Sequence, residues 1–493
     1  MSRMDLPDRR YLAGQFVAGP RAVTDDHLTR TLTFADLHLS VHPLLSTTRA
    51  QHGETDLLML GTAVHPEHTT WRESDVMGWL ARSATAVELE EAMAALAGRF
   101  VLFVRIGSTA TIVYGDACGL RPGFYLRAES GLWLASQPGL LERHAGAQRD
   151  VRLAPLPGAS PEGDVWPAGR TPLTGVQMVL PNHRLSIDDA APTRFWPTAP
   201  ITTVDPEIAA QRMARQLRGI VLGLVDRGPV TILLTGGYDS RSLLAAAWPV
   251  RRRLRYLTAV DVATPSHDAS IPLRLALRGR LRLRFRWSRP ATPHAVGRQR
   301  AVTGQVWRDP NQHRELVFSS AQGTTALIAN ASEVVRCAFY EGGNPPPAIT
   351  AELLSEYHGW AQDPFAITAF EHWLAGVPQG TGIHPLDLYY WECRVGVWGA
   401  LSALSMELQV DAFSPFNCRD LLVTGLGTPV ASRKHPWLLH RRIVEILAPQ
   451  ISTIPYNATT FTWLKTRLPA PVRRSVRRLR RRAAGSDLTY HPS

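Results

Sequence analysis

The order of apolar and polar residues changes near residue 200. Between residues 98 and 141, short segments rich in β-branched and aromatic residues alternate with Gly, Ser and Pro, which is typical of antiparallel hairpins. A helix is predicted just before them, because apolar residues recur at roughly helical spacing at Val87, Leu89, Ala92, Met93 and Leu96. Residues 154–200 are rich in proline and indicate loops around one or two short strands. Together these segments predict an α+β first domain, residues 1–200.

After residue 200, predicted strands alternate with helices. VTILLT at 230–235 is a continuous apolar run, as expected for a strand buried on both faces. There follow a Gly-rich turn, the helical stretch Ser240–Trp248, a strand near Arg255–Val260, a helix near His267–Leu277 and the alternating segment LRLRFRW at 281–287. This order predicts a parallel sheet with right-handed crossovers. Because residues 351–447 are mostly helical in pattern, we predict an α/β domain over residues 201–470 with a helical C-terminal part.

Composition narrows the class of protein. The chain has 493 residues, of which 45% are hydrophobic and 19% charged, so it can form two cores, and global disorder is not expected. No apolar run is long enough for a transmembrane helix, and the first ten residues lack a signal-peptide core, so we expect a cytoplasmic protein. The four cysteines are scattered without a CxxC pair, and HExxH is absent, which argues against zinc ribbons, iron–sulfur sites and disulfide scaffolds.

The positive charge is concentrated in two segments. Residues 251–300 contain thirteen Arg and two Asp, a net +11, and RRSVRRLRRR at 473–482 adds +7; because the total is +12, the rest of the chain is net −6. We expect residues 471–493 to form a flexible tail that can bind an anionic partner such as RNA, a membrane surface or a leader peptide. In LRLRFRW, one solvated arginine face is the simpler interpretation.

One local motif carries chemistry. Leu234-Thr235-Gly236-Gly237-Tyr238-Asp239-Ser240-Arg241 lies between the buried strand and a helix. The two glycines allow a turn whose N–H groups point inward, and the start of the helix adds partial positive charge, so the segment suits an anion. The hydroxyls of Thr235 and Ser240 can bind phosphate oxygens, Asp239 can hold Mg²⁺, and Arg241 can add a fixed positive charge. The simpler alternative is a Gly-Gly turn that binds nothing.

The motif is not a Walker loop, because GxxxxGK[ST] is absent. It resembles the SGGxDS loop of the ATP pyrophosphatase (PP-loop) superfamily, with Thr235 in place of the first Ser. The resemblance implies that ATP is cleaved between its α and β phosphates to adenylate a substrate.

Residues 96–141 resemble the glutaminase-type domain of asparagine synthetases. The matches are Gly98-Phe100, Asp116, Gly119, Arg121-Pro122, Tyr125 and Ala135-Ser136. Further along, Glu333 stands where that family has the Glu of GxGxDE, and Arg394 and Pro415-Phe416 match its later helical elements. The resemblance implies an Ntn-hydrolase-like domain followed by an adenine nucleotide α-hydrolase-like PP-loop domain.

Departures from the family pattern limit what can be carried over. The family's glutaminase uses an N-terminal Cys, whereas residue 2 here is Ser and Cys118 is the first cysteine, so ammonia release from glutamine is not expected. The first domain is then similar to the relic domain of β-lactam synthetases and lasso-peptide cyclases. The GxGxDE segment has lost its glycines and its Asp, with Ser332 before Glu333. Pro455-Tyr456-Asn457 stands where R-x-K is expected, and Lys465 can substitute for its lysine.

The resemblance implies ATP-dependent, AMP-forming amide-bond formation. Asp239 and Glu333 would hold Mg²⁺, Lys465 would stabilise the leaving pyrophosphate, and a small-molecule or peptide substrate would supply both the carboxylate and the amine. A catalytically degenerate ATP-binding scaffold is the alternative, and a PP-loop RNA-modifying enzyme is the third hypothesis. The identity of the substrates and the oligomeric state are not predicted.

Two other groups of residues have competing interpretations. On a predicted helix, Tyr389 can share a face with Glu392, and Tyr390 with Arg394. A Tyr–Glu pair can accept a proton from an amine, but a buried aromatic residue beside a paired charge is the preferred interpretation. For Ser266-His267-Asp268, a helix N-cap is preferred to a role in the site.

Overall fold

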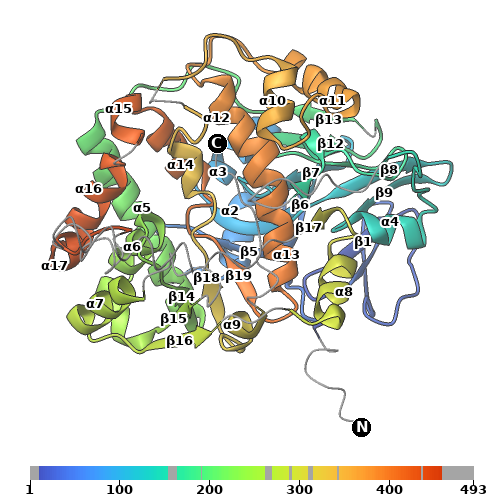
Figure 1. Ribbon diagram of the computed structural model, residues 1–493. Coiled ribbons are helices and arrows are strands. Elements are labelled where there is room, and N and C mark those ends of the chain that lie inside the picture. Colours follow the sequence, from blue (N-terminus) through green and yellow to red (C-terminus); the bar gives the residue numbers. More distant parts are fainter. Residues whose placement is uncertain are drawn as a thin grey trace, which may run out of the picture.

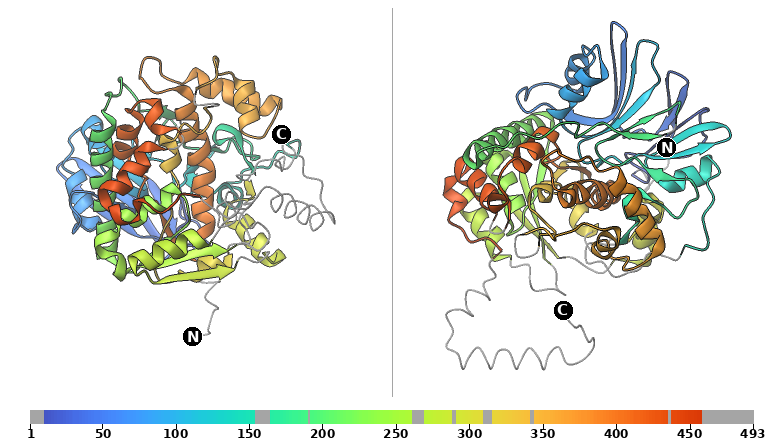
Figure 2. Two further views of the ribbon diagram at one scale, coloured as in Figure 1. Left: turned by 60° about the vertical axis from the view of Figure 1, so that its left-hand side comes forward. Right: turned by 90° about the horizontal axis from the view of Figure 1, so that it is seen from above.

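The computed structural model describes residues 10–153, 164–189, 191–260, 269–287, 291–308, 315–340, 344–434 and 437–457 (Figure 1). His267, Asp268, Lys465 and the predicted tail at 471–493 lie outside these residues. Figure 2 shows the strands of the first part, blue to cyan, on one side of the molecule and the green-to-red elements on the other.

The first part contains two six-stranded antiparallel sheets. One has the order β11 (Gln177–Met178), β8 (Phe124–Ala128), β9 (Gly131–Ala135), β1 (Phe16–Gly19), β3 (Leu37–Val41) and β2 (Arg30–Phe34). The other has the order β13 (Pro192–Arg194), β12 (His183–Ser186), β7 (Ile112–Gly115), β6 (Ala97–Ile106), β5 (Thr55–Val64) and β4 (Thr47–His52).

Strand β5 shows why the two sheets stack. Leu58 and Leu60 point into a core shared with strands of the other sheet. Leu57 and Met59 alternate with them and pack on the opposite face under two helices, α2 (Glu73–Leu80) and α3 (Ala86–Ala94). Because successive side chains of a strand point to opposite faces, one apolar run serves two cores. The result is a layered α+β sandwich.

The second part is built on a five-stranded sheet in which all neighbouring strands are parallel. Its order is β16 (Leu283–Trp287), β15 (Arg255–Val260), β14 (Val230–Leu233), β18 (Thr325–Leu327) and β19 (Asp411–Phe413). Helices of this part include α5 (Pro206–Arg227), α6 (Tyr238–Ala246), α7 (Ser270–Gly279), α8 (Pro293–Val302), α10 (Ala351–Tyr357), α11 (Pro364–Ala375), α12 (Pro385–Tyr389), α13 (Ala400–Met406), α14 (Arg419–Leu426) and α16 (Leu438–Leu447).

Much of the element pattern predicted from the sequence is confirmed. The strand–helix–strand order after residue 230 forms the parallel sheet, with β15 at the predicted residues. The hairpin segments at 98–141 do form antiparallel pairs, but they belong to both sheets of the sandwich, because the chain crosses between β7 and β8. Strand β19, inside the segment expected to be helical, was missed because it is only three residues long. The domain limits stay a prediction.

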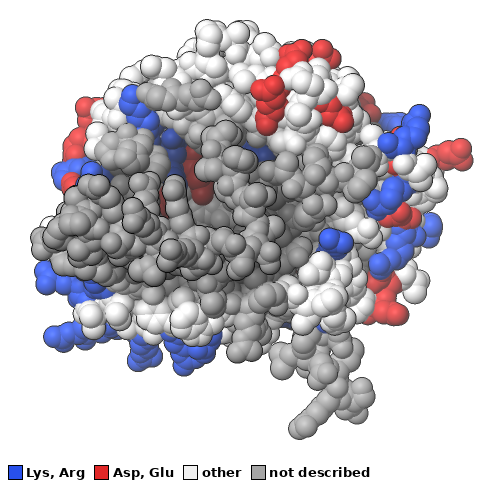
Figure 3. Space-filling model, in the orientation of Figure 1, with Lys and Arg blue, Asp and Glu red and all other residues white. Residues whose placement is uncertain are grey.

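The edge strand β16 carries part of the predicted basic surface. Arg284 in β16 and Arg282 just before it are exposed, as expected for a solvated arginine face, but Arg286 on the same face is half-buried and donates to Ser320 Oγ at 2.8 Å. Figure 3 shows Lys and Arg side chains gathered along the lower left edge, where Figure 1 places α7 and β16. None of the helices in the described part of the chain combines the length and apolar character needed to cross a bilayer.

Candidate functional site

The 235–241 loop lies where the connections of the parallel sheet change direction. From β14 the chain moves outward to β15 and β16, and then returns to β18 and β19 on the other side of β14. In open α/β sheets, ligands bind at the carboxyl ends of the strands at such a switch point. The loop follows β14, and a short helical turn, η4 (Ser332–Val335), follows β18, so both contribute to this edge.

Hydroxyl groups hold the loop in a tight turn. The Oγ1 of Thr235 and the Oγ of Ser240 lie 2.9 Å apart, and Ser240 Oγ also accepts from the Thr235 N–H at 3.1 Å. Gly237, the N-cap residue of α6, has no side chain with which to cap the helix, and its own N–H donates to Thr235 Oγ1 at 3.3 Å. The N–H groups of the first helical turn are therefore available to an anion.

Asp239 is engaged by other side chains. Its Oδ1 accepts from the Oγ of Ser332 at 2.6 Å, and its Oδ2 forms an ion pair with Nη1 of Arg336 at 2.7 Å. Burial lowers the pKa of Arg336, but the charges of Asp239 and Glu333 outweigh that effect, so the pKa is raised overall. Thus η4, which contains Glu333, lies beside Asp239.

His440 completes the cluster from α16. Its side chain is only 1% exposed, and its Nε2 lies 3.7 Å from Asp239 Oδ1. Neither ring nitrogen has a hydrogen-bond partner among the described residues. Burial lowers the pKa of this imidazole to about 4, an effect that Asp239 opposes and Arg336 reinforces, so the ring is neutral near pH 7.

The arrangement does not fit the predicted Mg²⁺ ion. Magnesium takes oxygen ligands at close to octahedral geometry, whereas both carboxylate oxygens of Asp239 are already bound and one faces a guanidinium. No group of three His, Cys, Asp or Glu suited to a metal occurs in the described ranges. Glu333 lies near, since its charge acts on Arg336, but the arrangement gives no reason to assign it as a metal ligand.

Arg241 has a different place from the one predicted. Its side chain is fully buried, and it donates to the carbonyls of Ile454 and, at 2.7 Å, Pro455. Its guanidinium also stacks on the ring of Tyr456, 3.7 Å from the centroid. These contacts fasten the 454–457 segment to α6, and a weaker one, from Nη2 to the carbonyl of Gly236 at 3.4 Å, joins Arg241 to the loop as well.

The 455–457 segment does lie against the loop. The N–H of Asn457 donates to the carbonyl of Gly236 at 3.0 Å, and Tyr456 stacks on Tyr238 with centroids 4.1 Å apart. The place expected for R-x-K is therefore next to the loop, although Pro, Tyr and Asn occupy it. Lys465 lies beyond the described residues, and its catalytic role stays a prediction.

The Tyr–Glu candidates are structural, as the preferred interpretation held. Glu392 is fully buried and bonds Arg194, Asn182 and the indole of Trp373. The hydroxyl of Tyr389 lies 3.0 Å from His358 Nδ1. Glu392 therefore holds the helical part to the sandwich, whereas Tyr389 makes its bond within the helical part.

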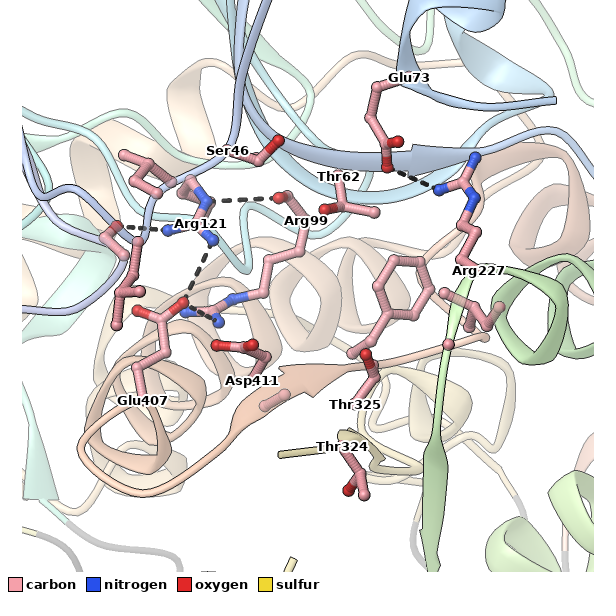
Figure 4. A pocket seen from close by; sticks show the side chains of 18 of the residues that line it. Ser46, Thr62, Glu73, Arg99, Arg121, Arg227, Thr324, Thr325, Glu407 and Asp411 are labelled. Atoms are coloured by element: carbon pink, nitrogen blue, oxygen red, sulfur yellow. Dashed lines mark hydrogen bonds and ion pairs between the residues drawn. The ribbon is translucent and has the colours of Figure 1, made fainter. Parts of the chain in front are cut away.

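A second charged region lies at the opposite edge of the parallel sheet. A cavity of about 570 Å³ opens between the sandwich and the segments that begin β14, β18 and β19 (Figure 4). Glu407 forms ion pairs there with Arg99 at 2.6 Å and with Arg121 at 3.2 Å. Arg227 pairs with Glu73 at 2.8 Å elsewhere on the cavity wall.

Sequence reasoning found the loop but missed three of its neighbours. Ser332 and Arg336 flank Glu333 within one helical turn, so the position of Glu333 could have pointed to them. Nothing local marks His440, which lies more than a hundred residues further along the chain.

Comparisons with known proteins give little support for any family. No family model matches the sequence, and no curated protein matches it. Among solved structures, the allosteric regulatory enzyme of purine biosynthesis is 12% identical, with a TM-score of 0.24, over 58% of this chain and 79% of that chain. Glutamine phosphoribosylpyrophosphate amidotransferase from B. subtilis, complexed with ADP and GMP, is 12% identical, with a TM-score of 0.23, over 65% of this chain and 70% of that chain. Both likenesses are too distant to support an argument about function, so asparagine synthetase-like ancestry stays a prediction from motifs.

Proposed function

We propose that this protein binds ATP at the 235–241 loop and uses it to activate a substrate carboxylate for amide-bond formation in the cytoplasm. The observation that carries the proposal is the uncapped start of α6, after a Gly-Gly turn, at the switch point of a parallel sheet. The motif resemblance to PP-loop enzymes supplies the choice of ATP.

In this reaction a carboxylate oxygen attacks the α-phosphorus, and the bond to the bridging oxygen of pyrophosphate breaks. Negative charge grows on the departing pyrophosphate, so N–H groups of the α6 start and the hydroxyl of Thr235 would stabilise it. A substrate amine then attacks the acyl carbon and AMP leaves. Nothing in this scheme uses ammonia from glutamine.

A second candidate is an ATP-binding scaffold without turnover. The engagement of Asp239 by Arg336 favours it, because a carboxylate bound to the chain's own guanidinium does not recruit a metal. An RNA-modifying enzyme is the third candidate, and the exposed side chains of Arg282 and Arg284 at the edge of the sheet are the observation in its favour.

Three measurements separate these candidates. The full chain is incubated with ATP and a panel of carboxylic acids and amines, and AMP and pyrophosphate are quantified by chromatography. Substrate-dependent release of both products supports the ligase, whereas calorimetric ATP binding without release supports the scaffold. Steeply salt-dependent tRNA binding that weakens on deletion of residues 473–482 would support the RNA enzyme.

A further inference from the structure

The positive charge beside Asp239 comes from the chain itself. Arg336 reaches one oxygen of the Asp239 carboxylate and Ser332 reaches the other. A divalent cation at Asp239 would have to displace the guanidinium, which would then repel it at close range. Displacement is also opposed by the aromatic face of Trp437, over which the Arg336 guanidinium lies 4.4 Å from the ring centroid.

Arg336 retains donors for a further anion. A guanidinium has five N–H donors, and Asp239 receives a hydrogen bond from one nitrogen, Nη1. The Nε of Arg336 is buried without an acceptor among the described residues. The side chain is 18% exposed, so it is held in place but not sealed from solvent. A phosphate at the start of α6 would therefore meet a cation already oriented by Asp239 and Trp437.

A second, independent feature points to a ligand at this place. His440 is almost fully buried beside Asp239 with both ring nitrogens unpartnered among the described residues. Buried polar atoms are normally hydrogen-bonded, and exceptions occur where a ligand or water completes the site. The cluster of Asp239, Ser332, Arg336 and His440 thus has both an oriented cation and unmet hydrogen-bonding capacity.

We infer that Arg336, and not a divalent metal, supplies the positive charge that meets the anionic ligand of the 235–241 loop, so that nucleotide phosphates bind here without Mg²⁺. The inference rests on the proposed function in taking a nucleotide as the ligand. On this inference Arg336 has two effects at the site: it attracts the phosphate groups of the ligand and it keeps a divalent metal ion from binding Asp239.

Calorimetric titration of ATP into the full-length protein, in EDTA and in excess Mg²⁺, tests this directly. The wild type should bind ATP with affinities that agree within about threefold in the two buffers, and Arg336→Met should weaken binding at least tenfold in EDTA. Arg227→Met is the matched control, because it removes a guanidinium of similar exposure, 12% against 18%, from an ion pair remote from the loop. Binding that requires Mg²⁺ would overturn the inference.

Manganese binding separates failure of this inference from failure of the proposed function. Mn²⁺ is titrated into wild type and Asp239→Asn without nucleotide, and the bound ion is measured by electron paramagnetic resonance. We expect no Mn²⁺ that depends on Asp239. One Mn²⁺ per chain that disappears in Asp239→Asn would contradict the inference even if ATP does not bind. Absence of ATP binding in both buffers, with no such ion, would refute the proposed function and the nucleotide as the ligand, but would still support Arg336 in place of a metal as the partner of Asp239.

Discussion

The two edges of the parallel sheet each carry an arginine–carboxylate cluster, and the clusters differ in how deeply their side chains are buried. At the amino edge, Glu407 joins Arg99 and Arg121, and all three side chains are less than 8% exposed. At the carboxyl edge, Asp239 and Arg336 are 21% and 18% exposed, respectively. The same chemical pair is therefore sealed in one place and accessible in the other.

In the buried cluster at the amino edge, both arginines also donate hydrogen bonds to backbone carbonyls. Arg99 donates to the carbonyl of Leu120 at 3.0 Å, and Arg121 donates to that of Gly14. Glu407 follows α13, whereas the arginines belong to the sandwich, so the cluster ties the two parts of the chain together. The two clusters therefore differ in depth of burial and not in how fully their donors are used, because Arg99 Nη2 and Arg336 Nε both lack an acceptor among the described residues.

Breaking the buried cluster at the amino edge should have the largest effect on stability. In Glu407→Gln two buried guanidinium groups lose their counter-charge, and we expect a loss of about 3–5 kcal/mol in the free energy of unfolding. Urea denaturation measures it. Asp411→Asn is the control, because Asp411 is 70% exposed in its ion pair with Arg10 and should cost less than about 1 kcal/mol. Equal losses in the two variants would erase the distinction between sealed and open pairs.

The carboxyl-edge cluster should make stability depend on pH. The pKa of His440 is about 4 in the folded protein and near 6.5 when unfolded, so the unfolded chain binds an extra proton between these values. Stability should therefore fall as the pH drops from about 7 to about 4, with a contribution of about 3 kcal/mol from this residue. His440→Leu should remove that part of the slope. Superimposable pH profiles of wild type and His440→Leu would show that the imidazole does not resist protonation.

Arg241 belongs to the loop motif but is buried like the arginines of the cluster at the amino edge, so it tests whether burial or position in the motif decides the role of an arginine. Its buried bonds to Ile454 and Pro455 class it with that cluster. We expect Arg241→Met to lower the free energy of unfolding by about 2 kcal/mol, with ATP affinity of the folded protein changed by less than about threefold. Thermal denaturation and calorimetry give the two quantities. A tenfold loss of affinity at unchanged stability would restore its predicted role at the phosphate.

The residues on which the resemblance to asparagine synthetases was based have a structural role in the first part of the chain. Asp116, one of the matched residues, accepts hydrogen bonds from the backbone N–H groups of Phe100, Leu120 and Arg121, and from the side chain of Asn417. Gly119 adopts a φ of 62° in that turn, a conformation that favours glycine. Asp116 and Gly119 therefore fix a turn of the sandwich and, through Asn417, its junction with the second part.

The partners of Asp239 could not be predicted from the sequence. The strand, Gly-Gly turn and helix are local features, and the pattern of apolar residues located them to within a few residues. Whether Asp239 faces a metal or a guanidinium depends on Ser332, Arg336 and His440, which two separate segments, one after β18 and one after β19, bring to the loop. The spacing of residues in a motif can therefore predict a metal ligand such as Asp239 only if it is also known which charged side chains, such as Arg336, lie beside it in the fold.

The most direct test of ATP binding at the loop is calorimetry of Gly237→Ala in EDTA. A Cβ on Gly237 would meet only Thr235 Oγ1 at 3.4 Å and Asn457 Oδ1 at 3.6 Å, so the ligand-free fold should tolerate it with a change below about 0.5 kcal/mol. The added methyl group would nevertheless stand where the backbone approaches a phosphate. Gly297→Ala, with open space around its Cβ, is the control. We predict that Gly237→Ala weakens ATP binding at least tenfold relative to wild type and Gly297→Ala. Equal affinities in all three proteins, or no ATP binding by the wild type, would contradict a phosphate site at this loop.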